Sequence, residues 1–148
     1  GHQFNKVEMV QYTTEDQADA AFEELVGKAE RLVQELGLHY RLSKLAAGDC
    51  SFSMARTYDI EVWIPSMGIY KEVSSASNAR DYQARRGNVK YRGADKKLHL
   101  AHTLNASGLA TSRVIPAIVE QYQNDDGSVT VPEVLRPYLG IDRIEKQR

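Results

Sequence analysis

Apolar side chains recur at helical spacing between Thr14 and Gly37, which is the clearest such stretch in the chain. Thr14 and Gln17 form a capping-box pattern at its start, and Gly37 is a typical stop signal. The apolar stripe consists of Ala18, Ala21, Phe22, Leu25, Ala29, Leu32, Val33 and Leu36. We therefore predict an amphipathic helix that covers a sheet, with binding of a partner protein as the alternative use of its apolar face.

Alternation of apolar and polar residues predicts strands in four other stretches. These stretches are residues 2–12, 38–45, 58–73 and 98–104. In the third, the turn at Pro65 to Gly68 divides the stretch into an antiparallel hairpin. In the first, Phe4 and Glu8 lie four residues apart and so project from the same strand face.

The stretch 102–123 changes from strand-like alternation to helical spacing halfway along. Ser107-Gly108 offers a turn, and a helix is predicted from Leu109 to Gln123. Pro116 requires that this helix either begins near Thr111 or bends at the proline. Arg113 lies near the helix start, where the backbone N–H groups and the helix dipole favour an anion, although a solvated surface arginine has the same pattern.

These elements predict an α+β fold in which two helices pack on a mostly antiparallel sheet. A chain of 148 residues fits one domain with its own core, and no internal repeat or low-complexity block indicates a second domain. A further short helix is expected to end at Gly87, capped by Ser77 or Asn78.

Composition narrows the classes of function. The formal net charge of −1 argues against a generally basic nucleic-acid binder, and the single cysteine excludes an internal disulfide. No apolar run approaches the roughly 20 residues of a membrane helix, and the start of the chain lacks a signal segment, so a cytoplasmic protein without a membrane segment is expected. The local basic residues are Arg80, Arg85, Arg86, Lys90, Arg92, Lys96 and Lys97. They form either a solvated face or a contact for RNA.

Asp59 and Glu61 are candidates for a role in catalysis or cation binding, because they lie two residues apart on one strand face. Such a pair can serve acid–base chemistry or hold a cation. Without a histidine or a third ligand, the simpler interpretation is that both carboxylates pair with nearby arginines.

The segment TLNASGLATSR, which ends at Arg113 and is followed by an apolar helix, resembles the third signature motif of class II aminoacyl-tRNA synthetases. Within that class, TLN-x-S-G-LA is similar to the seryl-tRNA synthetases. Three further stretches agree in order: QFNKVEM at 3–9, TYDIEVWIPSMGIYKEVSSASN at 57–78, and DYQARR at 81–86. The resemblance extends nearly without gaps from residue 2 to about residue 140.

This resemblance implies an ATP site. Arg113 would be the catalytic residue that covers the adenine and phosphates, with Phe4 stacked on the adenine. The EVSS segment would lie against the phosphates, and Mg2+ would be held by Glu72 and Ser75. The residues implied to bind ATP are Phe4, Glu72, Val73, Ser74, Ser75 and Arg113.

The resemblance also implies that Glu8, Asn105 and Ser107 bind L-serine. Seryl-tRNA synthetases join L-serine to ATP with loss of pyrophosphate, transfer the seryl group to tRNA(Ser), and act as homodimers. Residues 1–148 would be the carboxy-terminal portion of such a catalytic domain, without its first motif, the arginine of its second motif or the amino-terminal coiled coil. We therefore expect little activity from this chain alone. The alternative is a non-catalytic scaffold, or a binding module that has kept the synthetase fold.

Overall fold

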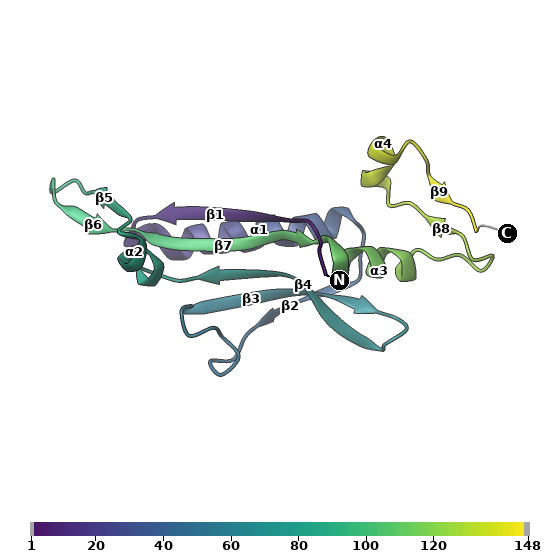
Figure 1. Ribbon diagram of the computed structural model, residues 1–148, viewed down its shortest axis with the longest axis horizontal. Helices are drawn as coiled ribbons and strands as arrows, with labels where there is room; N and C mark the ends of the chain where they lie inside the picture. The colour runs from purple at the N-terminus through teal and green to yellow at the C-terminus, as the bar shows by residue number, and fades with distance from the viewer. Residues whose placement is uncertain (1, 147–148) are drawn as a thin grey trace.

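A five-stranded antiparallel sheet forms the centre of the computed structural model, which describes residues 2–146 (Figure 1). Its strands, in spatial order, are β1 (Lys6–Thr13), β7 (His102–Ala110), β4 (Ile69–Asn78), β3 (Arg56–Ile64) and β2 (Tyr40–Lys44). Every neighbouring pair is antiparallel. The predicted α+β class is confirmed, and strands far apart in the sequence become neighbours.

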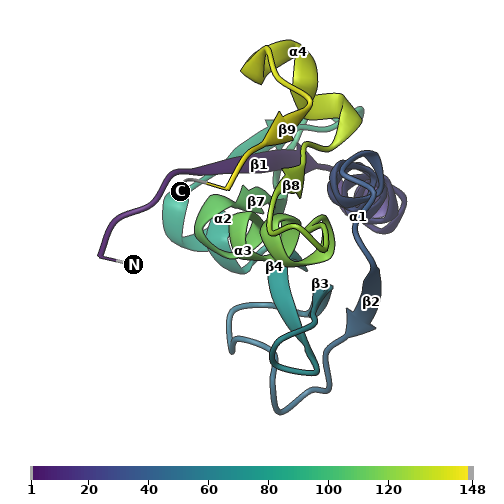
Figure 2. The ribbon, with the colours of Figure 1, turned by 90° about the vertical axis from the view of Figure 1, so that its right-hand side faces the viewer.

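Helix α1 (Ala18–Glu35) covers one face of this sheet, as the view along the long axis shows (Figure 2). Its stripe buries Phe22 and Val33 completely against sheet residues such as Ile60. Burial of a side chain of this size contributes roughly 1.5–3 kcal/mol. The predicted helix is thus confirmed as a cover for the sheet.

The predicted capping box at the start of α1 is wrong. Thr14 makes no side-chain capping bond, because the chain enters the helix through a 3-10 turn, η1 (Glu15–Gln17). In that turn the backbone N–H of Gln17 donates to the carbonyl oxygen of Thr14 at 3.3 Å.

Helix α3 (Thr111–Gln121) begins where β7 ends, two residues later than predicted. The predicted turn at Ser107-Gly108 is wrong, because β7 continues through these residues and pairs with β1. A Cβ on Gly108 would lie 3.3 Å from Val7 of β1, so glycine allows the two strands to approach closely at this point. Pro116 lies inside the helix, which does begin at Thr111.

The end of the sheet remote from α3 carries a short helix and a hairpin (Figure 1). Helix α2 (Tyr82–Gly87) follows β4, and β5 (Lys90–Arg92) pairs with β6 (Leu98–Leu100). The predicted cap of α2 is wrong, because Ser77 and Asn78 belong to β4 and Asp81 precedes the helix. No helix within residues 2–146 is long and apolar enough to cross a bilayer.

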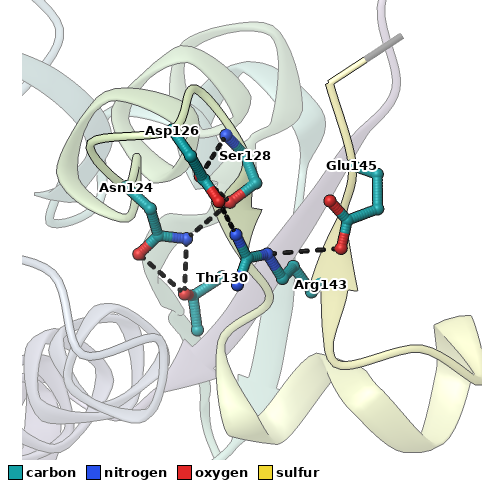
Figure 3. Close-up of polar contacts among 6 residues, drawn as sticks. All are labelled: Asn124, Asp126, Ser128, Thr130, Arg143 and Glu145. Carbon is teal, nitrogen blue, oxygen red and sulfur yellow. Dashed lines mark hydrogen bonds and ion pairs between the residues drawn. The ribbon is translucent and has the colours of Figure 1, made fainter.

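The last described segment folds beside α3. It contains β8 (Val129–Thr130), η2 (Glu133–Leu135), α4 (Arg136–Leu139) and β9 (Arg143–Ile144). A polar network joins β8 to β9 (Figure 3). In this network Asp126 accepts a hydrogen bond from the Ser128 backbone N–H at 3.0 Å and another from the Ser128 hydroxyl at 2.6 Å. Asp126 also forms an ion pair with Arg143 of β9. These contacts, led by the Ser128 hydroxyl, lower the pKa of Asp126 below its usual value.

Two glycine substitutions test the contact between the end of α1 and the end of α3. Gly37 has φ +67°, and a Cβ there would lie 2.3 Å from the Tyr122 hydroxyl, which donates to the Leu36 carbonyl at 2.8 Å. Gly37→Ala should lower the free energy of unfolding by about 1–2 kcal/mol from the backbone strain alone. Urea denaturation measures the change.

Gly27→Ala is the matched control, because Gly27 lies within α1 and a Cβ there meets nothing within 4 Å. It should raise the free energy of unfolding by about 0.5–1 kcal/mol. Equal effects of the two substitutions would contradict the assigned packing around Gly37.

Candidate functional site

A β-bulge at Val73 determines which side chains of β4 reach the sheet face opposite α1. Across the β3–β4 pair, Ile60 is opposite Ser74 but Glu61 is opposite Glu72, which leaves one extra residue in β4. Residues three apart on a regular strand point to opposite faces. The extra residue reverses this alternation, so that Glu72 and Ser75 project from the same face.

The register on β3 supports this assignment. Asp59 is opposite Ser75 and Glu61 is opposite Glu72, and these two acidic residues are two apart on one strand face. Val73 and Ser74, between the candidate ligands, are 0% and 1% exposed, so their side chains are buried in the sheet. Any contact of Val73 or Ser74 with a ligand would therefore use main-chain atoms.

Arg113 lies over this face from the first turn of α3. Its Nη1 donates to the Glu72 carbonyl oxygen at 3.1 Å and lies 3.2 Å from Glu72 Oε2. Both side chains remain about half exposed beside a cavity of about 480 Å3. The cavity is lined by Asp59, Glu61, Tyr70, Lys71, Glu72 and Arg113. The sequence-predicted catalytic arginine and metal-binding carboxylate thus meet at an open cavity.

The two acidic residues of β3 differ in their environment. Glu61 pairs with Arg41 of β2, as predicted, whereas no arginine lies within ion-pair distance of Asp59 in the described part of the chain. Asp59 Oδ1 is buried and has no hydrogen-bond partner among residues 2–146. Burial raises the pKa of Asp59, the Ser75 hydroxyl lowers it, and the neighbouring Glu72 carboxylate raises it. The prediction that both residues pair with arginines is therefore wrong for Asp59.

A second bulge lies next to the residues predicted to bind L-serine. Lys6 is opposite Ala110 and Glu8 is opposite Ser107, so β7 carries one extra residue between these pairs. Ser107 Oγ donates to Glu8 Oε2 at 3.2 Å, and Lys6 Nζ lies 3.0 Å from the same carboxylate oxygen. Lys6 was not identified from the sequence, although its position two residues before Glu8 puts it on the same strand face.

The two groups of polar residues share one continuous face of the sheet. Asn105 is opposite Ser77 across the β4–β7 pair, and these residues lie two positions from Ser107 and Ser75 respectively. On the opposite face, the neighbouring Ala76 and Ala106 are both 0% exposed within the core. The residues predicted to bind the metal and those predicted to bind L-serine therefore line a single surface.

Phe4 lies outside the strands and is 48% exposed, so the prediction that it projects from the same strand face as Glu8 is wrong. The adjacent Asn5 carbonyl accepts a hydrogen bond from Thr111 Oγ1 at 2.7 Å, so this segment passes the start of α3, two residues from Arg113. No stacking between the Phe4 ring and the Arg113 guanidinium is present in the part of the chain described here. Their joint contact with adenine remains a prediction.

The predicted basic cluster is separated from this site. α2 and the β5–β6 hairpin, which carry all of it except Arg80, lie at the end of the sheet remote from α3 (Figure 1). Arg85 of α2 pairs at 3.3 Å with Asp81, the residue before the helix, and the Arg86 guanidinium lies 3.5 Å from the centre of the Tyr82 ring. In the basic cluster, the charge of Arg85 is thus partly neutralised by a carboxylate, and that of Arg86 is covered by an aromatic ring.

The chain matches a family of known proteins. The profile of the tRNA synthetase class II core domain (G, H, P, S and T) matches residues 1–122. The chain belongs to this family. Among curated class II synthetases it is 70% identical over 145 residues to serine–tRNA ligase 2 of Clostridium acetobutylicum and 56% identical over 143 residues to the serine–tRNA ligase of Thermosipho melanesiensis. The resemblance to seryl-tRNA synthetases is thereby confirmed.

The solved structures agree. The seryl-tRNA synthetase of Pyrococcus horikoshii complexed with ATP matches with a TM-score of 0.95 and 42% identity over 99% of this chain. The cytoplasmic serine–tRNA ligase of Naegleria fowleri in complex with AMP matches with a TM-score of 0.90 and 38% identity. The chain spans about a third of the length of these class II synthetases and of the curated relatives.

The surroundings of Asp59 predict how its pKa responds to substitution. Arg113→Ala should raise the pKa of Asp59 further, because it removes a positive charge that favours the ionised form. Glu72→Gln should lower it, because it removes a negative charge. Carboxyl chemical shifts followed by NMR during a pH titration measure both changes.

The raised pKa of Asp59 also makes the stability of the fold depend on pH. A proton binds Asp59 more tightly in the folded chain, so this linkage stabilises the fold below the ordinary aspartate pKa. Its contribution is lost as the pH rises through the folded-state pKa.

The NMR titration has a clear contrary outcome. If the pKa of Asp59 shifted in the same direction in Arg113→Ala and in Glu72→Gln, Arg113 and Glu72 would not act on Asp59 through their charges.

Proposed function

We propose that this chain contributes part of the ATP and L-serine site of a serine–tRNA ligase. That enzyme would form seryl-adenylate and pyrophosphate, and would then transfer the seryl group to tRNA(Ser). The observation that supports this proposal best is the bulge at Val73, which places Glu72 and Ser75 on one face beneath Arg113. The same face continues to Glu8 and Ser107.

Glu72 and Ser75 suit Mg2+ bound together with ATP. One carboxylate and one hydroxyl supply the oxygen ligands that a hard cation prefers, while phosphates and water complete its shell. When bound, Mg2+ neutralises charge on the phosphates. Glu72 is engaged by Arg113 in the structure, so ATP would draw the guanidinium from this carboxylate to the nucleotide.

Arg113 and Phe4 would hold the adenine from opposite faces. A cation over an aromatic face contributes about 0.5–2 kcal/mol. The arginine charge would also oppose the triphosphate, and such fixed charges and positioning supply most of the catalysis in reactions of this kind.

Glu8, Asn105 and Ser107 would select L-serine. Glu8 can accept hydrogen bonds from the ammonium and hydroxyl groups of serine, in place of its present contacts with Lys6 and Ser107. A site built to bond a hydroxyl strongly rejects analogues that lack one. In the complete enzyme, tRNA(Ser) binding, assembly as a homodimer and a cytoplasmic location are part of the same proposal.

A second candidate is a non-catalytic scaffold or a binding module that keeps the synthetase fold. The internal ion pairs Arg113–Glu72 and Lys6–Glu8 favour it, because each engages charged groups that the ligase would use for its substrates. The two candidates differ in whether nucleotide displaces these pairs.

Calorimetric titration of this chain with ATP and Mg2+ separates the two candidates. We expect weak binding that Arg113→Ala reduces at least tenfold, because a charge opposite the phosphates is lost. Phe4→Ala should reduce it by about 5- to 150-fold, because stacking of a base on an aromatic ring is worth about 1–3 kcal/mol by alanine substitution. Exchange of pyrophosphate into ATP with serine should be absent, because the chain covers only a third of its relatives.

Arg31→Ala and Phe52→Ala are the matched controls. Arg31 is an exposed arginine of α1, paired with Glu35 at 2.8 Å, and Phe52 is an 89% exposed aromatic residue of a loop. Neither should change ATP affinity. If Arg113→Ala and Phe4→Ala also leave it unchanged, the scaffold is the correct function.

A further inference from the structure

Asp59 differs from the other carboxylates that line the cavity. Glu72 is paired with Arg113, and Glu61 is paired with Arg41. Asp59 has no ion-pair partner among residues 2–146, and its Oδ1 accepts no hydrogen bond there although the atom is buried. Buried polar atoms are nearly always satisfied, so an unsatisfied one calls for a physical explanation.

The register brings Asp59 next to one candidate metal ligand. Asp59 of β3 is directly opposite Ser75 of β4, and Cβ atoms of such a pair lie roughly 4.5–5.5 Å apart. The charges around the Asp59 carboxylate come from Glu61 on its own strand, Glu72 on β4 and Arg113 on α3. Only the Ser75 side chain among these neighbours carries a hydroxyl proton to donate.

A hydroxyl that ligates a cation has a specific geometric need. Its oxygen gives a lone pair to the cation, so its proton points away and requires a separate acceptor. Acceptors of this kind orient the ligand and increase its basicity. Ser75 therefore needs an acceptor beside it that is not already occupied by an arginine.

We propose that Asp59 is a positioning residue, which accepts the Ser75 proton and thereby holds the Ser75 oxygen toward the cation of the bound nucleotide. The proposal rests on the function proposed above, in which Glu72 and Ser75 hold that cation. Asp59 itself does not touch the cation or the nucleotide. Its unpaired, buried oxygen is the acceptor kept for the ligand-bound state.

The test measures binding of the Mn2+–ATP complex to this chain by the enhancement of water-proton relaxation, because ATP alone binds Mn2+ and removes the EPR signal of the free ion. Asp59→Ala should weaken Mn2+ binding about 10- to 100-fold, as the loss of such a positioning contact does. The double variant with Ser75→Ala should bind no more weakly than Ser75→Ala alone, because Asp59 acts through Ser75. Additive losses would overturn the proposal.

Asp59→Asn separates hydrogen bonding from charge. It keeps an acceptor oxygen in the same shape and removes the charge, so it should retain most of the affinity that Asp59→Ala loses. Equal losses in the two variants would show that Asp59 acts by charge alone and would contradict the proposal. Urea denaturation identifies a variant that fails to fold, and the isosteric Asp59→Asn then carries the test together with Ser75→Ala.

Two further variants separate this inference from the proposed function. Glu72→Ala removes the cation ligand itself, and Asp49→Ala removes an acidic residue of the loop after β2. If Glu72→Ala weakens Mn2+ binding and Asp59→Ala does not, only the inference about Asp59 fails. If the unsubstituted chain does not bind Mn2+ with ATP, or Glu72→Ala has no effect, the proposed function fails as well. Asp49→Ala should leave Mn2+ binding unchanged.

Discussion

The single extra residue in β4 is the constraint on which the arrangement of the site depends. A regular strand would direct Glu72 and Ser75 to opposite faces, one toward α1 and one toward the cavity. The bulge at Val73 makes both accessible from the same side and buries the two residues between them in the sheet. The Arg113 contact with Glu72, and the position of Ser75 beside Asp59, both follow from this change of register.

A bulge in β7 lies beside the residues predicted to bind L-serine, and it has a cost in backbone strain. Leu109, within the bulged segment, has φ +81°, a conformation that costs a non-glycine residue of order 1–3 kcal/mol. Residues in such conformations persist where the surrounding structure holds them, and here β1 pairs on both sides of the bulge. Thus both irregular points of the sheet lie next to candidate ligand-binding residues, as bulges often do.

The elements with strong periodicity were predictable from the sequence, and the irregular ones were not. The apolar stripe of α1 and the β3–β4 hairpin follow from spacing alone, because burial of one face requires that spacing. Ser107-Gly108 has turn composition, yet its glycine serves the close approach of β1, a contact between residues about a hundred positions apart. No local pattern encodes such a contact. For the same reason the alternation along β4 did not reveal that Glu72 and Ser75 share a face. Their pairing came from the family resemblance, and the register explains it.

The most direct measurement is a crystal structure of this chain with ATP and Mn2+, with the ion located by its anomalous scattering. The account predicts a peak at coordinating distance, about 2.0–2.3 Å, from both a Glu72 carboxylate oxygen and the Ser75 hydroxyl oxygen. Bound nucleotide with its ion held away from these two residues, or with Ser75 turned toward the core, would contradict it.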